Sequence, residues 1–199
     1  KKLDCQKEVV TAKQGYDKAA GEVNIKAASS EAPPAAAGTA TYVGVEECGM
    51  CHKEAVEFWK TTKHVKAWQT VVAANKQFNF DCISCHVTGF EKPGGSSIGY
   101  NEDLRGVQCE QCHGPGSLHV DAEGAAQQRS TILRRPDESV CLQCHTPLHS
   151  DTFAGNFDAY LRDVTGAGHG PAVRASLGDG ETAAELRAAG LKKAGAFIG

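Results

Sequence analysis

The sequence predicts a mainly α-helical fold with much irregular loop, whose core is built largely from something other than side chains. Aromatic residues make up only 7% of the 199 residues, and 22 residues are glycine. Such a chain has little bulky apolar material for a conventional core. The missing bulk is explained by the cysteines, because eight of the nine fall into four copies of one short pattern.

The repeated pattern is Cys-x-x-Cys-His, which is the attachment site of a c-type haem. Its thiols are Cys48 and Cys51, Cys82 and Cys85, Cys109 and Cys112, and Cys141 and Cys144. Its histidines, which would each bind iron from one side, are His52, His86, His113 and His145. The sequence therefore predicts four covalently bound haem c groups and a multihaem cytochrome c with a core of stacked haems. Without the haems, the apoprotein is expected to be largely unfolded.

Zinc sites, thioredoxin-like sites and disulfides are the alternative interpretations of paired cysteines. None of them requires a histidine directly after the second cysteine, yet one stands there in all four copies. A thioredoxin-like motif would also occur once, after a strand. The pattern favours haem attachment.

Four further histidines match the four open iron faces: His64, His119, His149 and His169. The single methionine, Met50, lies between Cys48 and Cys51 and is badly placed to reach a distal face. We therefore expect bis-histidine ligation and low potentials. The alternative is that some of these histidines are ordinary surface residues. No residue is assigned a catalytic role.

Charge and hydropathy exclude several classes of protein. The formal net charge is −3, and no basic cluster indicates nucleic-acid binding. No segment approaches the ~20 apolar residues of a transmembrane helix. The N-terminus has no apolar stretch of a signal peptide, so we expect a mature, exported form, because haem c is attached outside the cytoplasm. Cys5 has no assigned role.

Four zones are expected along the chain. Residues 1–26 form a charged N-terminal arm, and residues 27–42 an Ala/Pro linker. Residues 43–150 hold every motif and form the tetrahaem domain. Residues 151–199 form a Gly/Ala-rich extension that packs on the haem domain or on a neighbouring subunit.

Periodicity and capping signals predict four helices. Glu54–Asn75 has an apolar face that includes His64, with a possible break near Thr61. A second helix is capped by Ser117 and runs to about Ala126. A third starts at Pro136 and contains the fourth motif, and a fourth spans Glu181–Lys193.

The first and third motifs resemble the tetrahaem c-type cytochrome family that includes the electron carrier of ammonia oxidation. The matching segments are Thr-Lys-His64-Val-Lys-Ala-Trp and Cys109-Glu-Gln-Cys112-His113-Gly-Pro-Gly-Ser-Leu-His119. The resemblance implies closely stacked haems, with His119 ligating the first and His64 the third. His149 and His169 would then serve the second and fourth. The two ends of the chain resemble filament-forming surface cytochromes such as outer-membrane cytochrome E.

These features predict an electron carrier rather than an enzyme, because iron with two histidine ligands has no open position for a substrate. We expect a filament at the cell surface or outside the cell, passing electrons between copies of itself or other cytochromes and on to extracellular metals or other acceptors. The alternatives are a discrete periplasmic shuttle and a haem reductase with one open iron site.

Overall fold

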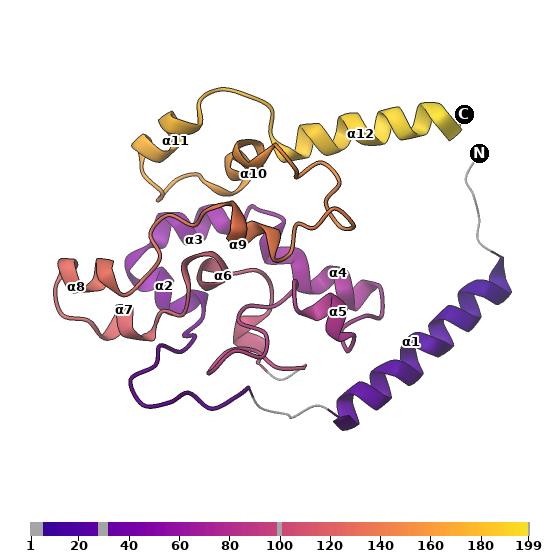
Figure 1. Cartoon of the computed structure of the whole chain (residues 1–199), viewed down its shortest axis with the longest axis horizontal. Helices are drawn as coiled ribbons and strands as arrows, with labels where there is room; N and C mark the ends of the chain where they lie inside the picture. The colour runs from indigo at the N-terminus through magenta and orange to yellow at the C-terminus, as the bar shows by residue number, and fades with distance from the viewer. Residues whose placement is uncertain (1–5, 28–31, 99–100, 199) are drawn as a thin grey trace. The chain divides into compact units, whose positions relative to one another are not determined.

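The computed structural model describes residues 6–27, 32–98 and 101–198, so Cys5 lies outside the described residues. The protein is mainly helical, with 55% of its residues in helices, and most of the helices are short and joined by loops (Figure 1). In the described part of the chain, β pairing is limited to an isolated bridge between Val87 and Arg105. The predicted fold class is confirmed.

The helices follow one another along the chain in this order. They are α1 (Lys7–Ala27), α2 (Val45–Cys51), α3 (Lys53–Trp59), η1 (His64–Lys66), α4 (Ala67–Ala73), α5 (Phe80–Ile83), η2 (Glu102–Leu104), α6 (Cys109–His113), α7 (Ser117–Asp121), α8 (Ala125–Ser130), α9 (Glu138–Leu142), α10 (Phe157–Val164), α11 (Pro171–Leu177) and α12 (Ala183–Ile198).

Two compact units divide the chain, and each is described by itself. Among the described residues, the larger unit comprises 6–27, 32–51, 63–98 and 101–136. It contains the cysteines of the first motif and all of the second and third. The described residues of the smaller unit are 52–62 and 137–198, and they contain the fourth motif.

The apolar core of the larger unit lies between α4 and α5, which pack against each other (Figure 1). Its buried members are Trp68, Val71, Ile83, Val87 and Ile98. The helical stretch predicted for Glu54–Asn75 is confirmed together with its break. After α3 ends, the Thr62 hydroxyl donates to the Trp59 carbonyl at 2.8 Å, and the chain resumes as η1 and α4.

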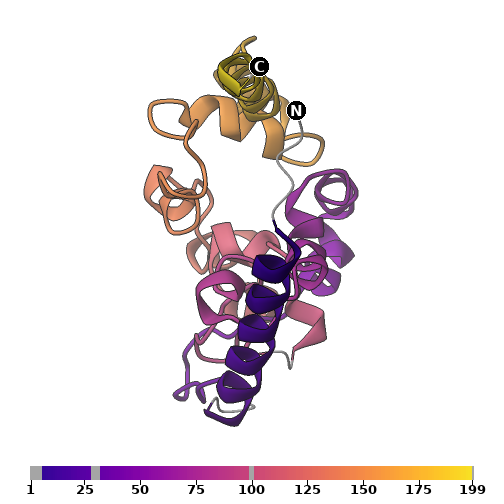
Figure 2. The same ribbon diagram turned by 90° about the vertical axis from the view of Figure 1, so that its right-hand side faces the viewer.

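The N-terminal helix α1 is one uninterrupted helix of 21 residues (Figure 2). It is held by polar contacts rather than by an apolar stripe. Asp17 pairs with Lys76 at 2.5 Å, and the Asn24 amide donates to the Phe78 carbonyl at 2.8 Å. Gly21 is buried beside Phe78, where an added Cβ would make an ordinary van der Waals contact at 3.4 Å.

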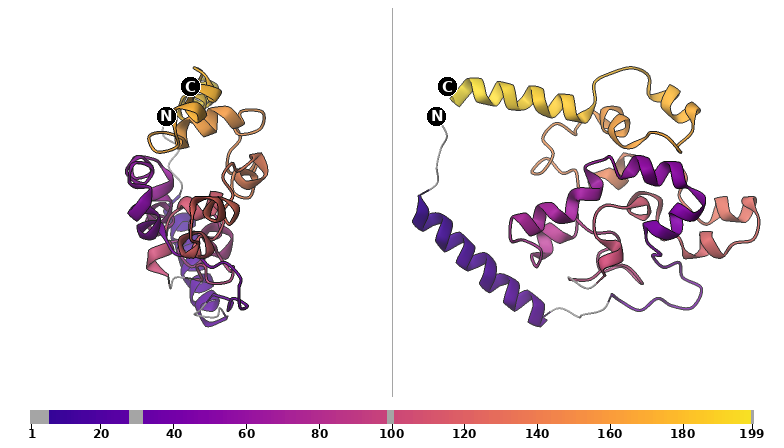
Figure 3. Two further views of the ribbon diagram at one scale, coloured as in Figure 1. Left: turned by 90° about the vertical axis from the view of Figure 1, so that its left-hand side faces the viewer. Right: turned by 180° about the vertical axis from the view of Figure 1, so that it is seen from behind.

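In the smaller unit, α10 packs against both α11 and α12 (Figure 3, right). Phe153, Tyr160 and Ala183 are buried together between these segments. The predicted C-terminal helix is confirmed, although it begins at Ala183 and extends to Ile198.

Two predicted helix boundaries are wrong. Ser117 is the first residue of α7 rather than its cap, and its hydroxyl instead accepts a hydrogen bond from the Thr41 amide at 2.8 Å. The chain then turns after Asp121, before α8. In the fourth motif, Asp137 caps α9 by accepting from the Ser139 amide, and the helix ends before His145.

Candidate haem-binding sites

A buried carboxylate ties the segment before the first motif to the third motif. Glu110 occupies a variable position of the third motif and is only 2% exposed. Its carboxylate accepts hydrogen bonds from the amides of Val43 (2.9 Å), Gly44 (2.8 Å) and Gly116 (2.7 Å). Unpaired, these buried amides would each cost free energy. The side chain therefore fixes α2 against α6, which pack together.

Gln108 and Thr88 extend the same network to the second motif. The Gln108 side-chain oxygen accepts from the Val45 amide at 2.8 Å, while its own backbone amide donates to the Thr88 hydroxyl at 2.9 Å. Thr88 is fully buried and donates in turn to the Gly106 carbonyl at 2.9 Å. The Gly106 amide donates to the His86 carbonyl at 3.1 Å. Buried polar side chains thus bring together three of the four motifs.

The thiols of Cys48 and Cys109 belong to different motifs and lie within hydrogen-bonding distance of each other. This hydrogen bond, together with burial, raises the pKa of the Cys48 thiol. The same bond lowers the pKa of Cys109, which is therefore the more readily deprotonated of the two. The contact shows that the first and third attachment sites are neighbours.

Two of the motif histidines are oriented by backbone carbonyl groups. The His86 Nδ1 lies 2.6 Å from the Ala67 carbonyl oxygen, and the His113 Nδ1 lies 2.6 Å from the Leu133 carbonyl oxygen. Because a carbonyl oxygen only accepts, each Nδ1 must carry the proton. The Nε2 lone pair is then available for iron, which is the usual arrangement of a metal-bound histidine.

His119 is presented in the same way although it lies outside the motifs. Its Nδ1 is 2.7 Å from the Gln128 carbonyl oxygen, so its Nε2 is also available for a metal. Its helix is joined to the segment before the first motif, because the Ser117 amide donates to the Thr41 carbonyl at 3.0 Å. His119 thus lies in a segment tied to the first motif, whose haem it is expected to ligate.

The fourth motif histidine has different surroundings. The His145 Nδ1 contacts the Ser150 hydroxyl at 2.7 Å. Its ring stacks on Phe153 with centroids 5.2 Å apart and meets the edge of Tyr160 at 5.0 Å. Burial, and secondly the positive charge of Arg187, lower the pKa of His145, which favours the neutral imidazole that binds iron.

The remaining predicted ligands are placed in three different ways. The His64 carbonyl accepts from the Val107 amide at 3.1 Å, which sets η1 beside the third motif. The His149 Nδ1 contacts the Thr146 hydroxyl at 3.0 Å. The His169 Nδ1 accepts from the Gly166 amide at 3.3 Å, so its proton is on Nε2. Iron binding by His169 through Nε2 therefore requires this loop or ring to rearrange.

The residues fit covalent haem. None of the eight motif cysteines is in a disulfide bond, and no cluster of three or more potential metal-binding side chains occurs among the described residues, as a zinc site would need. Large apolar side chains beside the motif and spare histidines are exposed to an unusual degree, as expected of surfaces that a porphyrin covers. They include Met50 (78%), Leu118 (39%), Leu133 (46%), Leu142 (45%) and Leu148 (86%).

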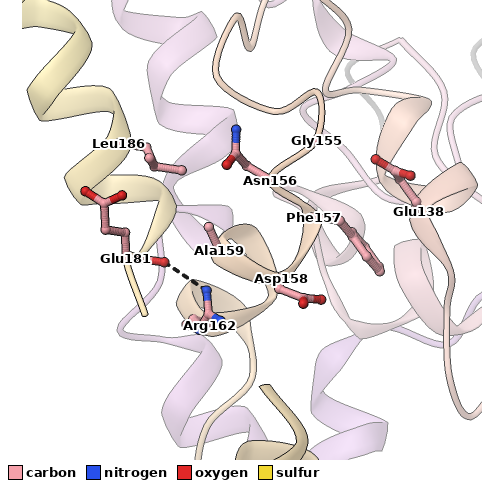
Figure 4. Close-up of a pocket in the computed structure, with 9 residues that line it drawn as sticks. All are labelled: Glu138, Gly155, Asn156, Phe157, Asp158, Ala159, Arg162, Glu181 and Leu186. Atoms are coloured by element: carbon pink, nitrogen blue, oxygen red, sulfur yellow. Dashed lines mark hydrogen bonds between the residues drawn. The ribbon is translucent and has the colours of Figure 1, made fainter. Parts of the chain in front are cut away.

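Two open pockets lie in the smaller unit. One of about 420 Å³ is lined by Asp158, Arg162 and Glu181 among others (Figure 4). The Arg162 guanidinium donates to the carbonyls of Leu177, Gly178 and Glu181, so it stabilises the fold. The other, of about 610 Å³, adjoins the His169 loop and includes Phe58 in its wall.

The polar network was not foreseen from the sequence. The two variable residues of the third motif, Glu110 and Gln111, are both polar, and Gln111 accepts from the Gly89 amide at 3.0 Å. Two polar side chains within a motif that is expected to contact a porphyrin could have indicated this network. Ser150 and Arg187 carry no comparable signal, because they lie in unpatterned sequence.

Four attachment motifs on a mainly helical, loop-rich chain define a tetrahaem c-type cytochrome. A family model described as cytochrome c554 and c-prime matches residues 47–114. Cytochrome c-554 of Nitrosomonas europaea is 35% identical over 96 residues, which cover 40% of this chain and 41% of that protein. The chain therefore matches less than half the length of this relative.

A solved structure gives the broader likeness. The reduced state of cytochrome c554 from Nitrosomonas europaea is 25% identical, with a TM-score of 0.50. The alignment covers 63% of this chain and 83% of that one. The chain is thus similar to cytochrome c554 in both sequence and fold. Its expected closeness to filament-forming surface cytochromes stays a prediction.

Proposed function

We propose that the chain is an electron-transfer protein that carries four bis-histidine c-type haems and has no substrate chemistry of its own. The observation that carries this proposal is the shared orientation of His86, His113 and His119. Each Nδ1–H donates to a backbone carbonyl oxygen, at 2.6, 2.6 and 2.7 Å. Bound haem iron supplies a one-electron couple between Fe(III) and Fe(II).

The protein's part is to hold the axial ligands rigidly in one tautomer. His119 supports a second ligand on at least one iron, because a histidine outside the motifs is prepared in the same way as two motif histidines. Two imidazoles leave no coordination position for a reactant and favour Fe(III), which keeps potentials low. The likeness to cytochrome c554 supports the same class of activity.

The test is the spin state of the iron in the purified holoprotein. Wild-type protein should bind four haems per chain, show low-spin spectra, and bind no CO when reduced. His119→Ala should leave four haems attached but make one high-spin and able to bind CO. His169→Ala serves as the comparison at a second spare histidine. High-spin iron or CO binding in the wild type would contradict full bis-histidine ligation.

A haem reductase with one open iron site is the second candidate, and the orientation of His169 favours it. Its Nδ1 accepts from Gly166 rather than donating, and a pocket of about 610 Å³ adjoins its loop. If His169 is not a ligand, His169→Ala will leave the spectrum unchanged and the wild type will already bind CO at one haem.

We further propose that the protein is exported and assembles into filaments outside the cell, with copies of itself as partners and extracellular metals or other acceptors receiving the electrons. Three exposed apolar residues spaced seven apart on α1 support self-association. They are Val9, Tyr16 and Val23, which are 60%, 71% and 63% exposed. None of the helices in the described part of the chain is long and apolar enough to cross a membrane.

The discrete periplasmic shuttle fits the likeness to cytochrome c554 equally well. Electron microscopy of the purified holoprotein separates the two. Filaments are expected, and their loss in Tyr16→Glu would identify the α1 surface. Monomeric particles at high concentration would favour the shuttle.

A further inference from the structure

The second, third and fourth motif histidines meet different hydrogen-bond acceptors. His86 and His113 each donate to a backbone carbonyl oxygen at 2.6 Å, with the Thr70 hydroxyl also 3.1 Å from the His86 Nδ1, whereas the His145 Nδ1 contacts the Ser150 hydroxyl at 2.7 Å. A stronger acceptor draws the Nδ1 proton away and makes the imidazole more basic, which stabilises Fe(III). A neutral hydroxyl oxygen is a weaker acceptor than an amide carbonyl. Ferric iron is therefore stabilised less on His145.

Burial acts in the same direction at this site. The His145 ring packs against Phe153, which is 1% exposed, and Tyr160, which is 7% exposed, and these two rings also contact each other. The Tyr160 hydroxyl bonds to the Thr152 hydroxyl at 2.9 Å, which fixes the ring. An apolar wall keeps water from the ligand, and low polarity disfavours the more highly charged oxidised state.

A positive charge also lies behind the aromatic wall. The Arg187 guanidinium lies 5.4 Å from the centre of the Tyr160 ring, whose edge meets the His145 ring with centroids 5.0 Å apart. Asp163 lies 3.5 Å from this guanidinium and offsets part of its charge. Asp137 and Glu138 also lie near the motif through Cys141, but Asp137 is exposed and Glu138 only partly covered. Water therefore screens the charges of these two carboxylates, whereas the aromatic wall around His145 excludes water.

From the hydroxyl partner of His145, its aromatic wall and the nearby arginine, we infer that the haem on Cys141 and Cys144 has a higher midpoint potential than the haems of the second and third motifs. Ser150, Phe153, Tyr160 and Arg187 are then positioning residues that set this potential through His145. Among these three haems, electrons then collect at the fourth site. This inference rests on the proposed electron-transfer function.

The test is a spectroelectrochemical titration of the holoprotein, resolved into four one-electron waves. Of the three waves that belong to the second, third and fourth motifs, the one with the highest midpoint potential is expected to be the fourth. Arg187→Gln should lower the midpoint potential of this wave and leave the other waves in place. The expected change is about tenfold in the Fe(III)/Fe(II) ratio at a fixed potential, which is about 59 mV for one electron. Lys192→Gln is the matched control, because it removes an exposed positive charge from the same helix.

Two substitutions at Ser150 separate tuning of the potential from a merely structural role. Ser150→Asp provides a stronger acceptor to the Nδ1 proton and should lower the same wave. Ser150→Ala removes the hydroxyl and should not lower it. If Ser150 had a purely structural role, both substitutions would shift the midpoint potential in the same direction. A decrease in Ser150→Asp without a decrease in Ser150→Ala therefore supports the inference.

The inference is overturned if Arg187→Gln moves a wave of lower potential, or if Lys192→Gln produces an equal shift. It is also overturned if both Ser150 variants lower the wave. Haem content, measured as four per chain in each variant, shows that the sites are loaded. Failure of the proposed function looks different: the wild type would then lack four reversible waves or would contain high-spin iron.

Discussion

The larger and smaller units hold the same five-residue motif by opposite means. In the larger unit, buried polar side chains, above all Glu110 and Thr88, bind backbone amides and carbonyls around three pairs of cysteines. In the smaller unit, Phe153 and Tyr160 pack directly on the motif histidine. The attachment motif therefore fixes the chemistry but leaves the means of support to the surrounding sequence.

The two kinds of support differ in how they should fail. A buried polar network is costly when one partner is lost, because the remaining groups stay buried and unpaired. An aromatic wall loses packing when it is truncated, and the loss stays local to the cavity. The following predictions use this difference, from the largest effect to the smallest.

Glu110→Ala should produce the largest effect, because it leaves the amides of Val43, Gly44 and Gly116 without their acceptor. At ~1–3 kcal/mol for each buried unpaired group, we expect a loss of about 5 kcal/mol in the free energy of unfolding. Holoprotein yield should fall with it. Denaturant unfolding monitored by circular dichroism measures the loss.

The matched control is Glu102→Ala on the same unit. The Glu102 side chain is 78% exposed and pairs with Arg105 at 2.9 Å, so its removal should cost less than about 0.5 kcal/mol. Equal stabilities for the two variants would show that the Glu110 network does not support the larger unit.

Phe153→Ala should cost about 3–4 kcal/mol, as expected when a fully buried phenylalanine is truncated. The damage should be confined to the smaller unit. Hydrogen–deuterium exchange should rise across α9 to α12 and stay unchanged in α4 and α5. Leu191→Ala, at a position that is 74% exposed on α12, should change nothing measurable. A rise throughout both units would contradict separate support.

Thr88→Val tests whether the polar network depends on individual hydrogen bonds. The substitution keeps the shape of the side chain but removes the bonds to Gly106 and Gln108, both at 2.9 Å. The expected cost is about 2 kcal/mol. Thr88→Ser, which keeps the hydroxyl and loses one methyl group, should cost about 1 kcal/mol. If serine proves the more damaging in thermal unfolding, packing rather than polarity dominates at this site.

The smallest effect concerns the attachment of α1 at low pH. Hydrogen bonds from Lys13 and Lys76 lower the pKa of Asp17 below its ordinary value of 3.8. A lowered carboxyl pKa stabilises the folded state above pH ~4 and ceases to do so as the pH falls through the folded value. Exchange protection of α1 should therefore decrease below pH ~4 in the wild type.

Asp17→Asn should reduce this protection at neutral pH and remove its acid dependence. Glu22→Gln, on an exposed position of the same helix, is the control and should behave as the wild type. Protection that is the same at pH 3 and pH 6 in the wild type would show that the ion pairs do not anchor α1.

Some features of the fold could be predicted because they depend on local chemistry. The break in the stretch Glu54–Asn75 follows from Thr61 and Thr62, whose hydroxyls bond to backbone carbonyls three residues earlier. The prediction that Ser117 caps a helix was wrong because a distant part of the chain, rather than local chemistry, decides what this hydroxyl binds. A serine next to a glycine turn is a good local cap, but its hydroxyl is taken by the Thr41 amide, 76 residues earlier in the chain.

The sequence by itself determined the cofactor and its number, because covalent attachment needs only two thiols and a histidine at fixed local spacing. It also contains four histidines outside the motifs, one for each haem. Only the tertiary structure decided which rings are prepared to bind iron, since the Nδ1 partners of His86, His113 and His119 lie 19, 20 and 9 residues away. A hydrogen bond across such a distance depends on how the chain folds back on itself, and no local pattern encodes it.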